Sequence, residues 1–258
     1  MLYKRIIAKL DIKSENVVKG IHMEGLRIVG SPKGMCVRYN SAGADEIIFI
    51  DTVASLYGRN HLKEFIFEAS EESFVPFTVG GGLRSVEDVS AMIKNGADKV
   101  AINTFAIENP HFIRELAEIF GSQAIVISIH AKRIGDTWMA FKENGRENSG
   151  KTVMEWVDEA TAMGAGELLV TSIDQDGTKK GFDHLLYQNI CSRVSVPVIA
   201  CGGAGSEEHI SDLISNSDCS GVALGSILHY EISSIEAIKL QLQNANIPVR
   251  PLVSGVYL

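Results

Sequence analysis

The sequence contains little of what would mark a disulfide-linked, metal-binding or membrane protein. Its 258 residues include only 4 cysteines, none in a CxxC spacing, so we expect free, mostly buried thiols rather than a disulfide framework or a zinc site. No apolar run approaches the roughly 18 to 20 residues that a membrane-spanning helix needs. Residues 1–7 show neither an apolar signal core nor a small-residue cleavage site, so we expect a cytoplasmic protein.

Positive charge is also scarce. The chain has 24 Lys and Arg residues against 32 Asp and Glu residues, a formal net charge of −8. Binding to nucleic acid normally needs clustered positive charge, so we expect no nucleic-acid partner. An anionic ligand would have to be held by local features such as backbone amides and helix N-termini.

What the chain does contain is a regular alternation of short β-rich runs and amphipathic segments with a helical period. Segments such as 85–95 and 152–163 have this period and separate the β-rich runs. Eight such units predict a closed parallel barrel, the (β/α)8 or TIM barrel, and the absence of a linker predicts one domain over residues 1–258. The eight predicted strands are Arg5–Ile12, Glu46–Asp51, Pro76–Gly80, Lys99–Ile102, Ala124–Ile129, Glu167–Thr171, Pro197–Cys201 and Gly221–Leu224.

The sequence repeats itself at half its length. The segment from Pro76 to Thr104 matches the segment from Pro197 to Ser226 at an offset of about 121 residues. Such a repeat predicts two half-barrels that place equivalent sites on opposite sides of one mouth. Two long stretches, residues 13–32 and 133–151, follow strand ends on the face where barrel enzymes work. The first is expected to be irregular and the second to form a small hairpin; each could be a lid or a variable surface loop.

Glycine-rich turns follow the third and seventh predicted strands, just before a helix begins. Glycine lets backbone amides approach an anion closely, and a helix N-terminus favours negative charge. Such glycines could also merely permit tight turns, but their recurrence in the repeat favours a ligand with a phosphate at each end. The candidate phosphate-binding residues are Gly82, Asn103 and Thr104 in the first half and Gly203, Gly225 and Ser226 in the second.

Two polar residues at strand ends are candidates for proton transfer. Asp11 ends the first predicted strand, and His130 follows the fifth on the opposite wall. An acid/base pair on opposite walls suits a reaction that removes a proton from one face of a substrate and delivers one to another. Asp51, Asp174 and Asp176 add carboxylates to the same rim, but without a histidine-rich pattern we expect no metal and no cofactor.

Four charged residues begin strands at the opposite end of the barrel. Two cations and two anions there would compensate one another in a ring. Such a ring could be a structural plug or a polar gate that admits a small molecule to the barrel axis. These residues are Arg5, Glu46, Lys99 and Glu167.

Taken together, these motifs resemble the HisF family, the cyclase subunits of imidazole glycerol phosphate synthase. The resemblance covers residues 1–250 and rests on Leu10-Asp11, Val17-Val-Lys19-Gly20, Gly43-Ala-Asp-Glu46, Thr78-Val-Gly-Gly-Gly82, Gly96-Ala-Asp-Lys99, Gly164-Ala-Gly-Glu167, Asp174-Gln-Asp-Gly-Thr-Lys and Gly202-Gly-Ala-Gly. It implies a barrel with a glutaminase subunit on its N-terminal face. Ammonia released there would pass the charged ring and reach a phosphoribulosyl formimino carboxamide ribotide, which is cyclised and cleaved to imidazole glycerol phosphate and an aminoimidazole carboxamide ribotide.

The resemblance also assigns individual residues. Asp11 matches one of the family's two catalytic aspartates, and Lys19 matches a loop lysine near the substrate, with Asp176 as the second substrate-loop residue. The second catalytic aspartate falls where this chain has His130. Lys9 shares the inward parity of Asp11, and as a buried ammonium it needs a partner, for which Asp11 or Asp51 is expected.

These departures leave a second function open. HisF-like paralogues supply ammonia for acetamidino groups on surface-polysaccharide sugars, and a non-cyclising delivery subunit of that kind would work with a glutaminase and a sugar amidotransferase. Such a subunit would keep the ring while its catalytic pair changed. A sugar-phosphate isomerase of the same half-barrel lineage is a third hypothesis, which the charged ring disfavours.

Overall fold

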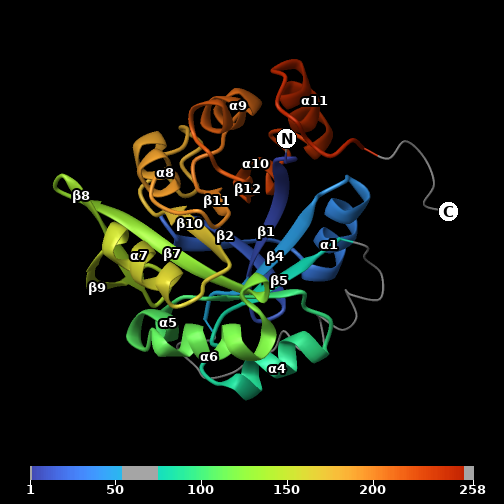
Figure 1. Ribbon diagram of the computed structural model, residues 1–258. Helices are drawn as coiled ribbons and strands as arrows, with labels where there is room; N and C mark the ends of the chain where they lie inside the picture. Colours follow the sequence, from blue (N-terminus) through green and yellow to red (C-terminus); the bar gives the residue numbers. More distant parts are fainter. Residues whose placement is uncertain (1, 54–74, 253–258) are drawn as a thin grey trace.

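Eight parallel strands close into a barrel in the computed structural model, which describes residues 2–53 and 75–252. Neighbouring strands pair in parallel in the order given below, and β10 pairs with β7 to close the circle (Figure 1). The predicted (β/α)8 barrel is confirmed. The strands are β10 (Glu167–Ser172), β11 (Val198–Cys201), β12 (Gly221–Leu224), β1 (Arg5–Lys13), β4 (Glu46–Asp51), β5 (Phe77–Gly80), β6 (Lys99–Ile102) and β7 (Ile125–Ile134).

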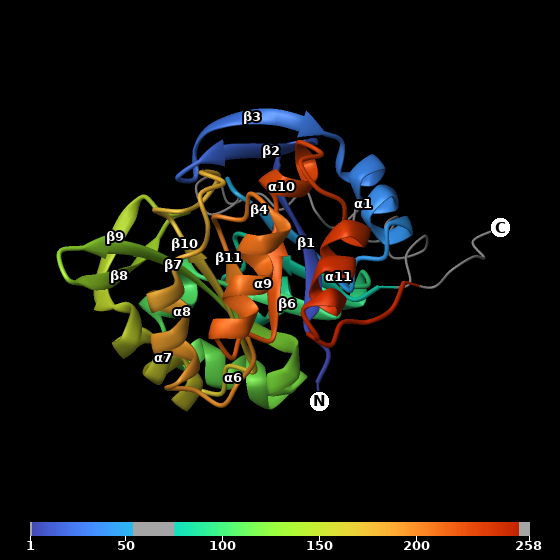
Figure 2. The same cartoon turned by 90° about the horizontal axis from the view of Figure 1, so that it is seen from above.

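Helices surround this barrel (Figures 1 and 2). Several begin at a serine or threonine whose side-chain oxygen accepts a backbone amide of the first turn, as at Ser85, Thr152 and Ser206. Residues 54–74, between β4 and β5, lie outside the described ranges. The described helices are α1 (Pro32–Ser41), α4 (Val86–Lys94), α5 (Thr104–Glu108), α6 (His111–Phe120), the short 3-10 helix η1 (Ser122–Ala124), α7 (Val153–Ala162), α8 (His184–Cys191), α9 (Glu207–Asn216), α10 (Ser226–His229) and α11 (Ile235–Asn244).

The alternation of side chains along the strands produces two apolar cores. Residues that point outward, such as Ile6, Phe49 and Leu168, pack against the helices in the larger core. Residues that point inward, such as Ile7 and Leu169, fill the barrel interior in the smaller core. The barrel is therefore packed along its middle, and polar groups are confined to its two ends.

Two antiparallel hairpins extend the sheet. The predicted hairpin in residues 133–151 is present as β8 (Thr137–Lys142) and β9 (Glu147–Thr152), with β8 paired to the extension of β7. The prediction that residues 13–32 are irregular is wrong, because β2 (Asn16–Ile21) and β3 (Glu24–Gly30) form a second hairpin on β1. Figure 2 shows this hairpin across the end of the barrel that lies away from the N-terminus.

The expected free thiols are present. Cys36, Cys201 and Cys219 are buried and Cys191 is half-buried, all without disulfides. Within the described ranges no helix is long and apolar enough to span a membrane.

Candidate functional site

Two pockets open at the end of the barrel formed by the carboxyl ends of the strands. One contains Gly82, Asn103 and Thr104, and the other contains Gly203, Gly225 and Ser226. The two halves of the barrel thus each contribute one pocket, and each pocket contains the phosphate-binding residues predicted for its half.

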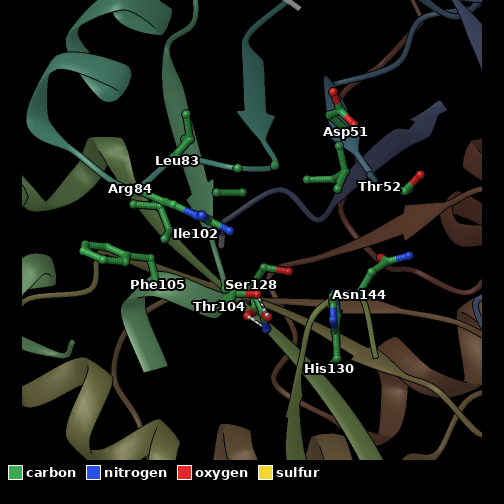
Figure 3. Close-up of a pocket in the computed structure, with 15 residues that line it drawn as sticks. Asp51, Thr52, Leu83, Arg84, Ile102, Thr104, Phe105, Ser128, His130 and Asn144 are labelled. Carbon is green, nitrogen blue, oxygen red and sulfur yellow. Dashed lines mark hydrogen bonds between the residues drawn. The ribbon is translucent and has the colours of Figure 1, made fainter. Parts of the chain in front are cut away.

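The pocket of the first half contains polar side chains from several elements (Figure 3). Figure 3 shows His130, Ser128 and Asn144 on one side of it, with Asp51 and Thr52 drawn across from them. The side-chain amide of Asn103 is fixed, since its nitrogen donates to the carbonyl oxygens of Ser128 (2.9 Å) and Phe141 (3.1 Å). Asn103 would therefore offer an anion its backbone rather than its side chain.

The pocket of the second half contains more charge. Lys9, Asp11, Lys19 and Asp176 line it together with Gly202 and Gly203. The hydroxyl of Ser226 is buried there without a hydrogen-bond partner. An unpartnered buried hydroxyl is costly unless a ligand satisfies it, which fits a site for a hydrogen-bonding group such as a phosphate oxygen.

The backbone conformation at the two pockets is nearly the same. Asn103 has φ −120° and ψ −85°, and its counterpart Gly225 has φ −118° and ψ −87°. Glycines with positive φ precede α4 and α9 at equivalent places, including Gly82 (φ 69°) and Gly203 (φ 110°). At Gly203 a Cβ atom would lie 2.0 Å from the carbonyl oxygen of Gly181, so only glycine fits there. The sequence repeat is thus also a repeat of local geometry.

An alternating chain of four charges lines the second pocket. The ammonium of Lys9 donates to Asp11, whose other oxygen lies 3.7 Å from the ammonium of Lys19. Lys19 in turn donates to both oxygens of Asp176 at 2.8 Å. Burial opposes the ionised form of Asp11, but the two ammonium groups outweigh it and lower the pKa of Asp11. The predicted pairing of Lys9 with Asp11 is confirmed.

The hairpin of β2 and β3 brings Lys19 to this place. The backbone amide of His22 donates to the carbonyl oxygen of Asp176 at 2.8 Å, and His22 Nδ1 lies 3.0 Å from the carbonyl oxygen of Ile173. These hydrogen bonds hold the hairpin against residues 173–176, so the two predicted substrate-loop residues, Lys19 and Asp176, lie together above the barrel.

His130 differs from these charged groups because it stands without a partner. It is buried, and its Nδ1 atom makes no hydrogen bond. Burial, and then the positive charge of Lys9, lower the pKa of His130 to about 4. At neutral pH this imidazole is uncharged and one of its nitrogens is a free acceptor.

At the other end of the barrel the four predicted ring residues form a closed ring of ion pairs. Glu46 accepts from Arg5 and from Lys99, at 2.9 Å in each case. Glu167 also accepts from Arg5, and from Lys99 at 2.8 Å. Burial disfavours ionisation of Glu167, but Arg5 and Lys99 outweigh it and lower the pKa of Glu167. Each cation thus contacts both anions across the barrel.

Not every rim carboxylate joins the site. Asp51 lines the first pocket, whereas Asp174 accepts the backbone amide of Arg133 at 2.8 Å and lies in neither pocket. Sequence reasoning missed Ser128 and Asn144, which line the first pocket. The inward parity of Ser128 with His130 on β7 is a signal that could have found it. In the described part of the chain no three His, Cys, Asp or Glu side chains gather as metal ligands would.

Comparison with known proteins agrees with this architecture. The model of the histidine biosynthesis protein family matches residues 5–234. The chain is 44% identical over 251 residues to imidazole glycerol phosphate synthase subunit HisF of Streptococcus sanguinis, covering 97% of this chain and all of that protein. This chain belongs to the HisF family. A HisF subunit of Legionella pneumophila is 52% identical over 208 residues, 80% of this chain and 98% of that protein. A HisF subunit of Helicobacter hepaticus is 44% identical over 250 residues, 96% of this chain and 99% of that protein.

Family membership agrees with the resemblance found in the sequence. In this HisF chain the two pockets contain the six predicted phosphate-binding residues, and Asp11 and His130 line one pocket each.

Proposed function

We propose that this chain is the cyclase subunit of an imidazole glycerol phosphate synthase. It uses ammonia to cyclise and cleave a bis-phosphorylated ribulosyl formimino carboxamide ribotide. The products are imidazole glycerol phosphate and an aminoimidazole carboxamide ribotide, which makes the enzyme a lyase of histidine biosynthesis. The observation that carries the proposal is the pair of equivalent glycine-lined pockets on opposite halves of one barrel mouth.

The geometry suggests how the substrate would be held. One phosphate would meet the backbone at Gly82, Asn103 and Thr104, and the other the backbone at Gly203 and Gly225 with the hydroxyl of Ser226. The reacting middle of the substrate would then lie over the axis. Asp11 and His130 come from opposite sides of the barrel and would move protons at two faces of that middle part.

The charged ring suggests where ammonia enters. We infer that a HisH-like glutaminase subunit docks on the N-terminal face and releases ammonia at the ring of Arg5, Glu46, Lys99 and Glu167. Ammonia is small and uncharged, so a momentary opening of one ion pair would let it pass, whereas larger solutes stay excluded. The cytoplasmic location of the complex stays a prediction from the sequence.

The test is turnover of the ribotide with ammonium salts by the purified chain, without any glutaminase. Formation of imidazole glycerol phosphate is the expected result. Absence of product at every pH between about 6 and 9 would show that the chain is not a cyclase.

Neither alternative function gains support from the comparisons. The relatives described above are named as HisF subunits of imidazole glycerol phosphate synthase, and none is named for sugar amidination or sugar-phosphate isomerisation.

A further inference from the structure

Two features at the mouth of the barrel stand out because the packing of the barrel alone does not explain them. The first is the buried Nδ1 atom of His130, which has no hydrogen-bond partner although the side chain lines the first pocket. A buried polar atom without a partner is costly, and at a ligand site the usual reason is that a ligand or substrate satisfies it. The ring lines the first pocket, so a bound group is the partner that we expect for this atom.

The second feature is the ammonium group of Lys9, which lies where the apolar interior of the barrel meets the mouth. Lys9 follows Ile7 in the inward-facing series of β1, and Ile7 belongs to the apolar interior. The Lys9 side chain is buried, donates to Asp11 and lines the second pocket beside Cys201. A path along the axis from the ring to the mouth therefore passes this cation before it reaches Asp11.

We propose that Lys9 is a positioning residue that divides the proton-transfer roles, because it holds Asp11 as its counterion and leaves His130 as the proton acceptor of the site. This inference rests on the proposed function. Within the acid/base pair of the proposed function, His130 then takes the proton that leaves the substrate, while Asp11, held ionised by Lys9, orients the opposite face and is not the first proton acceptor.

The charges around the two groups keep each in the resting state that this division needs, with Asp11 ionised and His130 neutral and therefore able to accept a proton. Lys9, Asp11, Lys19 and Asp176 form an alternating chain that sums to zero, so it offers a protonated His130 no net counter-charge. Lys9 disfavours a second positive charge at His130, while Asp11 and Asp176 favour one and burial opposes it. The other charged side chains in the pocket with His130 are Asp51 and Arg84.

Asp11 is a weaker proton acceptor than His130, because Asp11 is already held in an ion pair. Its carboxylate contacts Lys9 directly and faces Lys19 at 3.7 Å, so a proton arriving there would break a buried ion pair. His130 loses no such interaction when its Nδ1 atom accepts a proton. The geometry thus favours the imidazole.

The first test is an NMR titration of His130 in the full chain labelled at histidine, with the signal assigned from a His130→Asn variant. In the wild type we expect a neutral ring from pH 5.5 to 8. In Lys9→Met we expect the titration midpoint to rise by at least one pH unit, and in Lys9→Arg to stay at the wild-type value. Lys239→Met is the matched control, because Lys239 is also buried and pairs with Asp45 at 2.7 Å. Neither Lys239 nor Asp45 lines either of the two mouth pockets. It should leave the midpoint unchanged.

The second test is the ammonia-dependent rate at a fixed concentration of free ammonia. We expect His130→Asn to lower kcat at least tenfold more than Asp11→Asn does, and Lys9→Arg to retain most of the activity.

An equal or larger loss of kcat in Asp11→Asn would overturn the division of roles. So would a titration midpoint of His130 that is the same in Lys9→Met as in the wild type. A wild type without cyclase activity but with the expected titrations would instead refute the proposed function and leave the effect of Lys9 on His130 standing. If Lys9→Met does not fold, Lys9→Gln replaces it in the same titration.

Discussion

At the scale of single residues, the buried imidazoles should govern how stability depends on pH. Burial, together with nearby lysine ammonium groups, lowers the pKa of both His130 and His229 to about 4. His229 lies between the Tyr39 hydroxyl (2.7 Å) and the carbonyl oxygen of Lys9 (3.1 Å). The imidazoles of His130 and His229 are therefore both neutral in the folded protein at neutral pH.

The first prediction concerns this titration. The unfolded chain binds protons at these histidines near pH 6.5, and the folded chain only near pH 4, so their contribution is complete above pH 6.5 and is lost as the pH falls toward 4. The loss is about 3 kcal/mol for each imidazole at most. Denaturant unfolding at pH 7, 5.5 and 4.5 should show a falling free energy of unfolding. In His130→Asn the fall should be smaller by about half; an unchanged slope would contradict the buried neutral state of His130.

The second prediction concerns the identity of residue 130. Because a neutral imidazole with a free nitrogen can accept a proton, the wild type should turn over the ribotide with ammonia, and His130→Asp should be no faster. The new carboxylate would compete with Asp11 for Lys9 and disturb the existing pair. Initial rates of both proteins at equal free ammonia decide the matter. Activity that appears only in His130→Asp would mean that the wild-type site is inactive as a cyclase.

At the scale of elements, we propose that phosphate binding depends on the glycine turns. In Gly203→Ala the methyl group would meet the carbonyl oxygen of Gly181 and would strain a residue with φ 110°. The third prediction is a rise of at least tenfold in the KM for the ribotide, since the cradle must shift. Gly150→Ala is the matched control: its φ is 82°, but no atom lies within 4 Å of the added methyl group. It should lose stability and keep its KM; an equal rise in KM there would rule out a specific effect of the cradle.

A comparison of the predicted and observed elements shows which of them the sequence alone could predict. The eight barrel strands were predictable within about five residues, because each contains a short apolar run and several of them precede an amphipathic helix. The hairpin of β2 and β3 was not, because β3 is mostly exposed and lacks alternation. Its turn has His22 and Met23 at positive φ, where Asn-Gly would have been a recognisable signal.

Short helices escaped the sequence analysis for a different reason. Helices α5 and α10 have 5 and 4 residues, too few for a helical period to be visible. Both begin directly at the predicted cradles, at Thr104 and Ser226. The candidate phosphate-binding residues were therefore found through the repeat. The partners of Asn103 and the missing partner of His130 depend on side-chain packing that no sequence pattern reveals.

At the scale of the whole molecule, polar groups at the two ends of one packed barrel must work together. The fourth prediction tests the ring at the lower end. Lys99→Met removes a cation that contacts both Glu46 and Glu167, so the ring keeps a net negative charge that would hold ammonia at the entrance as ammonium. With a glutaminase partner, glutamine-dependent turnover should fall at least tenfold, while turnover with added ammonium changes less than twofold. Lys142→Met is the matched control, since Lys142 pairs with Glu108 and Glu147 away from the ring. Equal losses in both assays would argue that the ring is only a structural plug.

The account as a whole depends on the two halves of the barrel holding the two ends of one ligand. The most direct measurement is a crystal structure of the chain grown or soaked with inorganic phosphate. We predict two phosphate ions facing each other across the mouth, one against Gly82 and Thr104 and the other against Gly203 and Ser226. One ion alone, or none at either cradle, would contradict a bis-phosphorylated substrate and with it the central claim.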